Sequence, residues 1–475
     1  MVAVAAIALT MSGVAGTVGA PVAGAQRDFT FTGGGWGHGV GMSQWGARGL
    51  AANGRNHQQI LTHYYSGTTV GARPVNDDLR VLLTERAGTV TVVTTGITAI
   101  VDIGTVGANA TLRFTRSGNS VVVSGALNAS SATPMDIVFF APVTVSPPGY
   151  TYQYGRLAVR ADPAGGVRAV MGDLSMQEYL YGLGEMPSSW PAEALKAQAT
   201  ASRTFAQKRI AERADGKDFD LYGSVLHQAY TGTKFQAPAW TNAVDATAGQ
   251  VVTYGGGLID AVYSASSGGH TENSEIVWVS PVPYLRGVPD PYDAQGGNPN
   301  GSWSRTYSGA QLGSWFGLGT VTDVRITGNT GASGRVDKAT VQLTGTGGTK
   351  DVPGATFRST VNSRSPGSQL LSTKFTIGTS TGSTSRLATG DFHTARADGR
   401  SVIVGGLATD PDGQPLVRVV STMGSQRAVR EMRAIDGHFL MSWTGAPGTR
   451  NVCVTVLDQP SGQAVSLGCR DIVVK

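Results

Sequence analysis

Charge and aromatic side chains are both scarce in this chain. Charged residues make up 15% of its 475 residues and aromatic residues 7%, and the formal net charge is +5. Lysine and arginine form no run and no basic stripe interleaved with aromatics, so nucleic-acid binding is poorly supported. A mildly basic exterior suits loose attraction to an anionic surface, and an ordinary solvated exterior explains the same charge equally well.

Long apolar runs are also scarce, and the clearest one begins the chain. Residues 2–10 are almost wholly apolar, and a weaker apolar run leads to Ala-Gly-Ala at residues 23–25. This small-x-small pattern predicts a signal peptide over residues 1–25, although a basic n-region is missing. The alternative is a membrane anchor, but three glycines and a proline interrupt the run before the about 20 apolar residues that a span needs. We therefore expect a secreted protein with no membrane span after cleavage.

The chain has only two cysteines, Cys453 and Cys469. They flank a turn signal at residues 459–462 between two valine-rich runs, and a hairpin folded there brings them within disulfide reach. Export makes the bridge chemically reasonable, and two buried free thiols are the alternative. Neither cysteine has a metal-ligand partner at a recognisable spacing, so we expect no metal and no cofactor.

Glycine, in contrast, is abundant at 66 residues, and Thr, Val and Ser fill many of the stretches between glycines. This composition is typical of strands and turns. Residues 79–172 are predicted to be β-rich, and residues 249–265 to form a hairpin. We predict an α+β fold, in which a mixed β-rich domain over residues 28–377 is followed by a linker at 378–388. A small Ig-like β-sandwich is predicted over residues 389–475.

One long helix is predicted over residues 192–213, which are good helix formers. Pro191 fits a first turn, where its missing N–H costs little, and Ser189 is a candidate N-cap. Small residues recur at helical spacing on one narrow face, so we expect the helix to pack closely against a sheet.

Three long motifs carry the functional signal. Residues 179–187 read YLYGLGEMP, residues 263–273 read YSASSGGHTEN, and residues 35–47 read GWGHGVGMSQWGA. Together they closely resemble the stage II sporulation protein D family, also called the amidase-enhancer family. The resemblance covers roughly residues 29–377 and implies a cell-wall protein, since some members are lytic transglycosylases that cut peptidoglycan glycan strands.

The order of these motifs departs from the family. The GWGHGVGMSQ segment usually follows the rest of the domain, whereas here it comes first. The chain therefore resembles a circularly permuted member, an arrangement that is tolerated when the original termini lie close together. This interpretation predicts that His38 and Glu185 share one cleft.

Glu185 matches the catalytic glutamate of the family, and the resemblance implies that it serves as general acid and base. Cleaving a glycosidic bond requires a proton on the leaving oxygen, and one carboxyl group can give that proton and take one back. In a lytic transglycosylase the second proton comes from the 6-hydroxyl of the sugar, so a second catalytic carboxylate is not obligatory. The nearby helix N-terminus would lower the pKa of Glu185 and burial would raise it. A merely dipole-stabilising glutamate is the alternative.

The resemblance also implies a set of substrate-binding residues. Lys196 and Arg203 lie about two helical turns apart and either bind sugar or orient Glu185, unless they belong to a solvated face. The glycines around His38 indicate close approach of the backbone either to a sugar or to other protein segments. Three other glutamates, Glu178, Glu272 and Glu275, are expected to be solvated on the surface. The expected substrate-binding residues are His38, Ser43, Gln44, Lys196, Arg203, Ser266, Ser267 and Thr271.

Three functions compete. The first is a peptidoglycan lytic transglycosylase, and the second is a non-catalytic wall-binding module that stimulates a separate cell-wall amidase. The third is a scaffold or adhesin displayed through the C-terminal sandwich. The expected partners are peptidoglycan glycan strands and, for the second function, an amidase.

Overall fold

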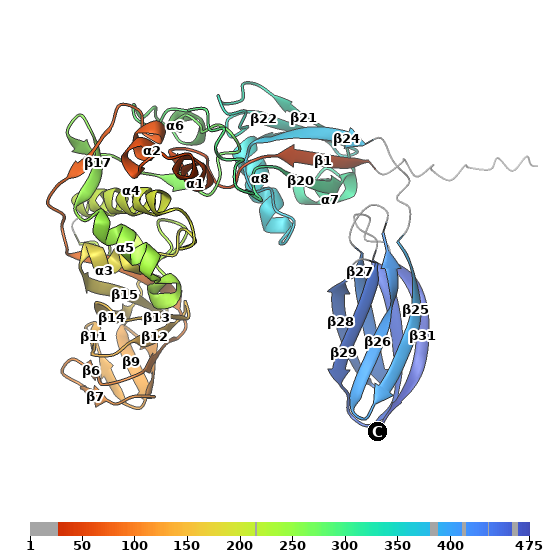
Figure 1. The fold of residues 1–475 in the computed structure, drawn as a ribbon. Coiled ribbons are helices and arrows are strands. Elements are labelled where there is room, and N and C mark those ends of the chain that lie inside the picture. The colour runs from red at the N-terminus through yellow and green to blue at the C-terminus, as the bar shows by residue number, and fades with distance from the viewer. Residues whose placement is uncertain (1–26, 214–215, 381–387, 411–414, 436, 458–463) are drawn as a thin grey trace, which may run out of the picture.

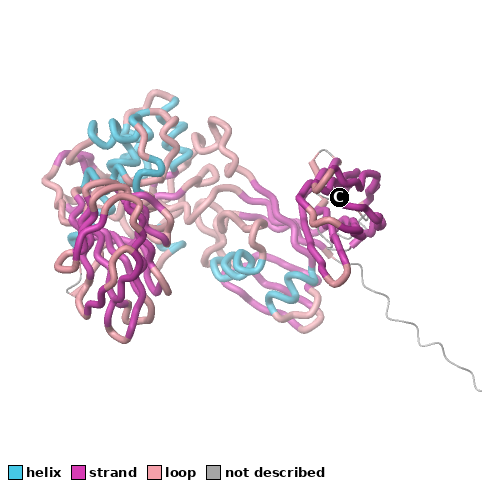
Figure 2. The backbone as a smooth tube through the Cα atoms, turned by 90° about the horizontal axis from the view of Figure 1, so that it is seen from below, coloured by secondary structure: helices cyan, strands magenta, loops and turns pink. Residues whose placement is uncertain are grey.

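The computed structural model describes residues 27–213, 216–380, 388–410, 415–435, 437–457 and 464–475 (Figure 1). The expected signal peptide at 1–25 lies outside these ranges, as does most of the expected linker at 378–388. The strand β24 (Phe375–Ser380) takes the first three residues of that linker. The fold is a β-rich α+β arrangement in which strands dominate and helices gather in two groups (Figure 2). None of the helices in the described ranges combines the length and apolar character that crossing a bilayer requires.

The β-rich part predicted at residues 79–172 folds as two sheets whose buried faces share one core. Buried and partly exposed residues alternate along β11 and β14, as expected for strands with one face against a core. The seven-stranded sheet has the order β16-β4-β15-β14-β11-β6-β7, and the six-stranded sheet has the order β10-β9-β8-β5-β12-β13. The strands are β4 (Leu79–Ala87), β5 (Val90–Thr94), β6 (Thr98–Ile100), β7 (Gly104–Val106), β8 (Thr111–Ser117), β9 (Ser120–Gly125), β10 (Ala129–Ser131), β11 (Met135–Phe139), β12 (Val143–Ser146), β13 (Tyr150–Tyr152), β14 (Arg156–Ala161), β15 (Val167–Leu174) and β16 (Leu221–Tyr222).

The long helix α4 (Ala192–Ala211) lies at the centre of the first helical group (Figure 1). It contacts α1 (Gln44–Ala52), α2 (His57–Tyr64), α3 (Met176–Tyr181), α5 (Pro238–Ala246) and β17 (Gln250–Tyr254). The expectation of one narrow buried face was wrong, since buried residues surround most of the helix. Its many Ala, Ser and Thr side chains are small enough to let neighbours approach from several sides. Ser189 is not the N-cap either, because Pro191 holds that position without a side-chain cap.

Short strands and a short helix complete this first group. The predicted hairpin at residues 249–265 is present as β17 and β18 (Gly257–Leu258), and β3 (Thr69–Ala72) extends its sheet. The strands β2 (Met42–Ser43) and β19 (Tyr263–Ser264) pair in parallel, and α6 (Ser274–Val277) follows shortly after β19. Their pairing places two of the three sequence motifs side by side.

A second core lies under the sheet β20-β1-β24, built from β1 (Asp28–Gly33), β20 (Trp303–Ser308) and β24. Phe31 packs against Phe357 and Phe375, with ring centroids 5.4 and 5.5 Å apart. The remaining elements of this part are β21 (Val321–Thr327), β22 (Thr340–Gly345), β23 (Gly348–Pro353), α7 (Gly309–Phe316) and α8 (Gly354–Arg364). The strand β1 pairs antiparallel with β24, so that Asp28 lies opposite Ser380. The first and last strands of this part are therefore neighbours, and Asp28 and Ser380 lie at the same end of the sheet.

The C-terminal residues form two antiparallel sheets of three and four strands around a core of their own. The sheet orders are β25-β26-β29 and β28-β27-β30-β31. The strands are β25 (Thr389–Asp398), β26 (Ser401–Thr409), β27 (Leu416–Met423), β28 (Gln426–Arg433), β29 (His438–Thr444), β30 (Gly448–Leu457) and β31 (Ala464–Val474). That this pair of sheets has the immunoglobulin-like sandwich fold stays a prediction.

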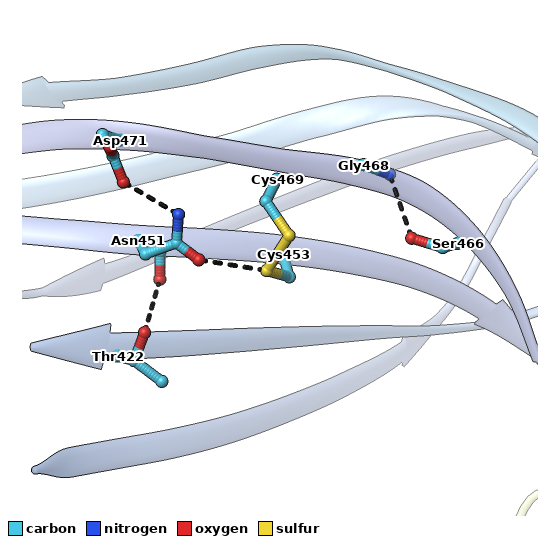
Figure 3. The surroundings of a disulfide bond; sticks show 7 residues. All are labelled: Thr422, Asn451, Cys453, Ser466, Gly468, Cys469 and Asp471. Atoms are coloured by element: carbon cyan, nitrogen blue, oxygen red, sulfur yellow. Dashed lines mark hydrogen bonds between the residues drawn. A yellow bond between two sulfur atoms is a disulfide. The ribbon is translucent and has the colours of Figure 1, made fainter.

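The disulfide between Cys453 and Cys469 is confirmed, with the two residues directly opposite each other on β30 and β31 (Figure 3). Two residues away along both strands, Asn451 donates a hydrogen bond of 2.8 Å to the carboxylate of Asp471. The predicted turn at 459–462 lies outside the described residues.

Candidate active site

A cavity of about 500 Å³ is lined by residues from all three sequence motifs. As the motif analysis predicts, His38 and Glu185 line the same cavity, although they are almost 150 residues apart in the chain. The walls come from the 35–47 motif, the Glu185 turn, α4, the loop after β16 and the 262–265 segment. The lining residues are Trp36, Gly37, His38, Gln44, Glu185, Phe205, Val225, Leu226, His227, Val262, Tyr263, Ser264, Ala265 and Trp278.

Backbone pairing brings these segments together. The 35–47 motif meets the 263–266 segment through the β2–β19 pair and through an antiparallel bridge between Trp36 and Ser266. The Glu185 turn meets the 228–231 segment through a bridge between Leu183 and Tyr230 and a bond of 2.9 Å from the Gly184 N–H to the Ala229 carbonyl. The cavity walls are therefore held by main-chain hydrogen bonds and do not depend on side chains alone.

The glycines of the 35–47 motif explain how this loop fits against the rest of the protein. Gly39 and Gly41 have φ of +73° and +71°, where a side chain is strained. A Cβ at Gly39 would lie 2.3 Å from the Arg335 guanidinium, and one at Gly41 would lie 2.2 Å from the Val262 carbonyl. At these two positions the glycines serve tight packing against other protein segments, which was one of the two interpretations that the sequence left open.

Glu185 lies in the turn between α3 and α4 and is partly exposed to the cavity. Its Oε1 accepts a hydrogen bond of 2.6 Å from the Ala229 N–H. Burial raises the pKa of the Glu185 carboxyl, and hydrogen bonds from Ala229, Tyr263 and Gln44 oppose that rise without cancelling it. The sequence could not say whether burial or the helix terminus dominates, and here burial does. Glu185 is the only carboxyl group among the described residues that line the cavity.

Tyr263 connects Glu185 to a hydrogen-bonded chain that the sequence analysis did not assign. The Tyr263 hydroxyl is hydrogen-bonded to the Glu185 carboxyl and accepts a bond of 3.0 Å from Gln228 Nε2. The Tyr179 hydroxyl in turn donates to Gln228 Oε1 at 2.8 Å. Both tyrosines stand in the sequence motifs, but Gln228 stands outside them and no local pattern marks it.

Gln44 supports Glu185 from the other side. Its amide nitrogen donates to the Glu185 carbonyl at 3.0 Å and to Gln198 Oε1 at 3.2 Å. Gln198 then donates to the Ser202 hydroxyl at 2.9 Å. Gln44 therefore both lines the cavity and fixes the Glu185 turn to α4.

His38 faces the cavity as a neutral ring. Its Nδ1 accepts a hydrogen bond of 3.0 Å from the Val40 N–H, so the proton of the neutral ring lies on Nε2. Burial and the neighbouring Arg335 guanidinium lower the pKa of His38 to about 4. The ring packs against Trp278, with centroids 5.2 Å apart. His38 therefore offers a substrate a hydrogen-bonding ring without charge at neutral pH.

Three expected substrate-binding hydroxyls lie behind the cavity in a buried network around Asp290 and Asp293. The Ser43 and Ser266 hydroxyls donate to Asp293 at 2.6 and 2.7 Å, and the Ser267 hydroxyl donates to Asp290 at 2.8 Å. All three side chains are buried. Their binding of substrate stays a prediction, and their observed partners are two carboxylates that the sequence analysis did not single out.

Thr271 is also buried, and its hydroxyl accepts a bond of 2.8 Å from the Val288 N–H.

The two expected substrate-binding residues on α4 also have partners within the protein. Lys196 pairs with Glu193 at 2.7 Å, and neither residue lines the cavity. Arg203 is fully buried and donates to the carbonyls of Gln250 and Val244 at 3.2 and 3.1 Å. In the structure Arg203 thus joins α4 to α5 and β17, and the sugar-binding role expected for it stays a prediction.

The expectation that Glu272 is solvated was wrong. Its carboxylate is fully buried and accepts hydrogen bonds from the Ser333 hydroxyl at 2.6 Å and the Ser333 N–H at 3.1 Å. Glu178 closes a capping box at the start of α3, and Glu275 pairs with Arg286.

Within the described part of the chain, no three His, Cys, Asp or Glu side chains are grouped as metal ligands would be.

These observations define a β-rich α+β protein with a single glutamate facing a cavity of neutral polar and aromatic residues. A family described as Stage II sporulation protein matches residues 165–254, a range that includes Glu185. The chain therefore carries a domain of the stage II sporulation protein D family.

Individual relatives are similar over parts of their length. An amidase enhancer of Bacillus subtilis (strain 168) is 39% identical over 150 residues, which are 29% of this chain and 19% of that protein. Stage II sporulation protein D of the same organism is 31% identical over 177 residues, covering 33% and 51% of the two chains. An uncharacterized protein of Brachyspira hyodysenteriae is 39% identical over 121 residues, covering 25% and 33%. The chain thus spans about half or less of each of these relatives.

Proposed function

We propose that this protein cleaves the glycan strands of peptidoglycan as a lytic transglycosylase, with Glu185 as general acid and base. The observation that carries the proposal is a single carboxyl group with a raised pKa that faces a cavity of about 500 Å³. A raised pKa keeps a carboxyl group protonated closer to neutral pH, which is what a general acid needs. The family of the matching domain supports a substrate in the cell wall.

The proposed reaction has two proton transfers at one residue. Protonated Glu185 gives its proton to the bridging oxygen as the bond from that oxygen to C1 of the sugar breaks. The sugar 6-hydroxyl then attacks C1, and the Glu185 carboxylate takes the hydroxyl proton as the 1,6-anhydro ring closes. The Tyr263 hydroxyl and the Ala229 N–H stabilise the carboxylate between the two steps. No water is consumed, so one carboxyl group suffices.

A digest of purified peptidoglycan tests this proposal. Incubation with the protein should release fragments that end in 1,6-anhydromuramic acid, identified by mass spectrometry. Fragments with ordinary reducing ends would indicate hydrolysis, and the absence of any new ends would contradict glycan cleavage.

The second candidate is a wall-binding enhancer of a separate amidase, and the relative named amidase enhancer favours it. The two candidates differ in one outcome. An enhancer binds peptidoglycan and raises the rate of an added amidase, and it does so equally well when Glu185 is replaced by alanine.

We also infer that the domain is circularly permuted and that the protein acts outside the cytoplasm. The antiparallel pair of β1 and β24 supports permutation, since Ser380 lies opposite Asp28 and a short turn there would restore the order usual in the family. The disulfide between Cys453 and Cys469 supports an oxidising compartment. Joining residue 380 to residue 28 and opening the chain elsewhere in the domain should preserve folding if the permutation is real.

A further inference from the structure

Large apolar side chains are exposed around the mouth of the Glu185 cavity. Trp36, Val225, Leu226 and Trp278 all line it and expose 48%, 93%, 71% and 40% of their surfaces. Val279, directly after Trp278, is 90% exposed. Exposed apolar side chains are ordinary when scattered, but a group at the mouth of one cavity marks a binding surface.

Both tryptophans at the mouth are held in place. The backbone N–H of Trp36 donates to the Ser266 carbonyl at 2.9 Å, and the backbone N–H of Ser266 donates to the Trp36 carbonyl at 3.2 Å. Trp278 directly follows the short helix α6 as its C-cap residue, and its backbone N–H donates to the Ser274 carbonyl at 2.8 Å. The Trp278 ring packs on His38. The backbone that carries both rings is therefore fixed, and the Trp278 ring is also held by His38, which lowers the entropy cost of binding a ligand there.

The cavity wall carries little charge at neutral pH. No lysine, arginine or aspartate is among the described lining residues. The two lining histidines, His38 and His227, have pKa values lowered to about 4, in both cases chiefly by burial, and are neutral at pH 7. Apart from Glu185, the polar side chains that remain among the described lining residues, such as the Gln44 amide, are uncharged. The ligand that fits has apolar faces and uncharged polar groups.

We propose that the mouth binds the sugars on either side of the cleaved bond through their ring faces and the methyl groups of their N-acetyl substituents, and that it discriminates against de-N-acetylated glycan. The proposal rests on the proposed function, which places a glycan strand in the cavity, and it names the substrate class more narrowly. A strand that reaches Glu185 must run across the mouth, because the polymer continues beyond the cavity. Aromatic rings give such a strand large contact areas.

The expected discrimination follows from two changes that removal of the acetyl group makes to the sugar. A glucosamine unit carries an ammonium group, and moving that charge from water to an apolar mouth is costly, since Glu185 supplies the only carboxyl group among the described lining residues. The same change deletes the methyl group that would cover a tryptophan face.

The test uses the full chain with the substitution Glu185→Gln and measures the binding of two probes by calorimetry and tryptophan fluorescence at pH 7. The probes are the tetramer of β-1,4-linked N-acetylglucosamine and the same tetramer without acetyl groups. We expect the acetylated tetramer to bind at least roughly tenfold more tightly. Trp36→Ala and Trp278→Ala, each added to Glu185→Gln, should weaken its binding roughly tenfold. Phe140→Ala, which removes an aromatic ring that is 78% exposed outside the cavity lining, should leave it unchanged.

Equal affinity for the two tetramers, or tryptophan variants that bind like the Phe140→Ala control, would overturn the proposal. Its failure is distinguishable from failure of the proposed function. If the wild-type protein cuts peptidoglycan while neither tetramer binds, the mouth proposal falls and the catalytic one stands. If the acetylated tetramer binds preferentially and through both tryptophans while no cleavage occurs, the mouth proposal stands and the catalytic one falls.

Discussion

The Ser43 hydroxyl donates a hydrogen bond of 2.6 Å to the carboxylate of Asp293, 250 residues further along the chain. The same carboxylate accepts bonds from the Ser266 hydroxyl at 2.7 Å and from the Ser267 N–H at 3.0 Å. Because Ser43 also caps α1 and precedes Gln44, which holds the Glu185 turn, this buried carboxylate connects two sequence motifs directly behind the cavity.

Asp293→Asn should therefore destabilise the domain strongly. An amide keeps one acceptor oxygen but turns two donors toward groups that already donate, so buried polar groups lose their partners. We expect the free energy of unfolding to fall by about 3 kcal/mol, measured by urea denaturation. Asp173→Asn is the matched control, because the Asp173 side chain is 59% exposed in its ion pair with Arg156. A loss no larger than in this control would show that the carboxylate does not clamp the motifs.

Asp290 makes the stability of this network depend on pH. Burial, together with the charge of Asp293, raises the pKa of Asp290 from 3.8 to about 6. A carboxyl group whose pKa is raised by folding contributes stability below its unfolded pKa and loses that contribution as the pH rises through its folded pKa. We expect the unfolding free energy of the wild type, relative to Asp290→Asn, to fall by about 2 kcal/mol between pH 4 and pH 7. A difference that stays constant over this range would contradict the raised pKa.

Tyr263→Phe should move the pH dependence of catalysis. The hydroxyl stabilises the ionised form of Glu185, so its removal raises the pKa of that carboxyl further. The general acid must be protonated in the free enzyme, and the alkaline limb of the kcat/KM profile should therefore shift to higher pH. Tyr254→Phe, at a tyrosine outside the cavity lining, serves as the control. An unshifted limb in an active Tyr263→Phe protein would argue against this hydrogen bond.

The disulfide should stabilise the C-terminal sheets and leave the cavity unaffected. The cysteines are 16 residues apart in sequence, and closing a loop of that size contributes about 3 kcal/mol. Replacing both cysteines by serine should lower the unfolding temperature of the C-terminal part in calorimetry, while peptidoglycan cleavage stays at the wild-type rate. Identical unfolding before and after reduction of the wild type would contradict a stabilising bridge.

The sequence predicts the strand-rich part, the cysteine pair and the meeting of two distant motifs, because each depends on a local pattern or a long motif. Alternating valines and leucines between residues 79 and 172 indicate strands, whichever sheet each strand joins. His38 and Glu185 line one cavity, as the resemblance of their two motifs to one family predicts.

The side-chain partners could not be predicted in the same way. Arg203 is expected from the resemblance to bind sugar or to orient Glu185, and Glu272 is expected on the surface, yet both are fully buried and hydrogen-bonded. Asp293 and Gln228 follow no recognisable spacing, and their importance arises only when loops from distant segments meet. The face of α4 that packs was also mispredicted, because small side chains allow neighbours on several sides and leave no clear apolar stripe.

The most direct test of the account compares two substitutions, one at the carboxyl group that faces the cavity and one at a nearby carboxyl group outside it. Glu185→Gln should reduce the formation of 1,6-anhydromuramic ends from purified peptidoglycan by roughly 10³-fold, because it removes the proton donor. Glu193→Gln, at the start of the same helix but outside the cavity lining, should retain activity within a small factor. If Glu185→Gln releases anhydro ends at the wild-type rate, Glu185 is not the acid and the enzymatic account is wrong.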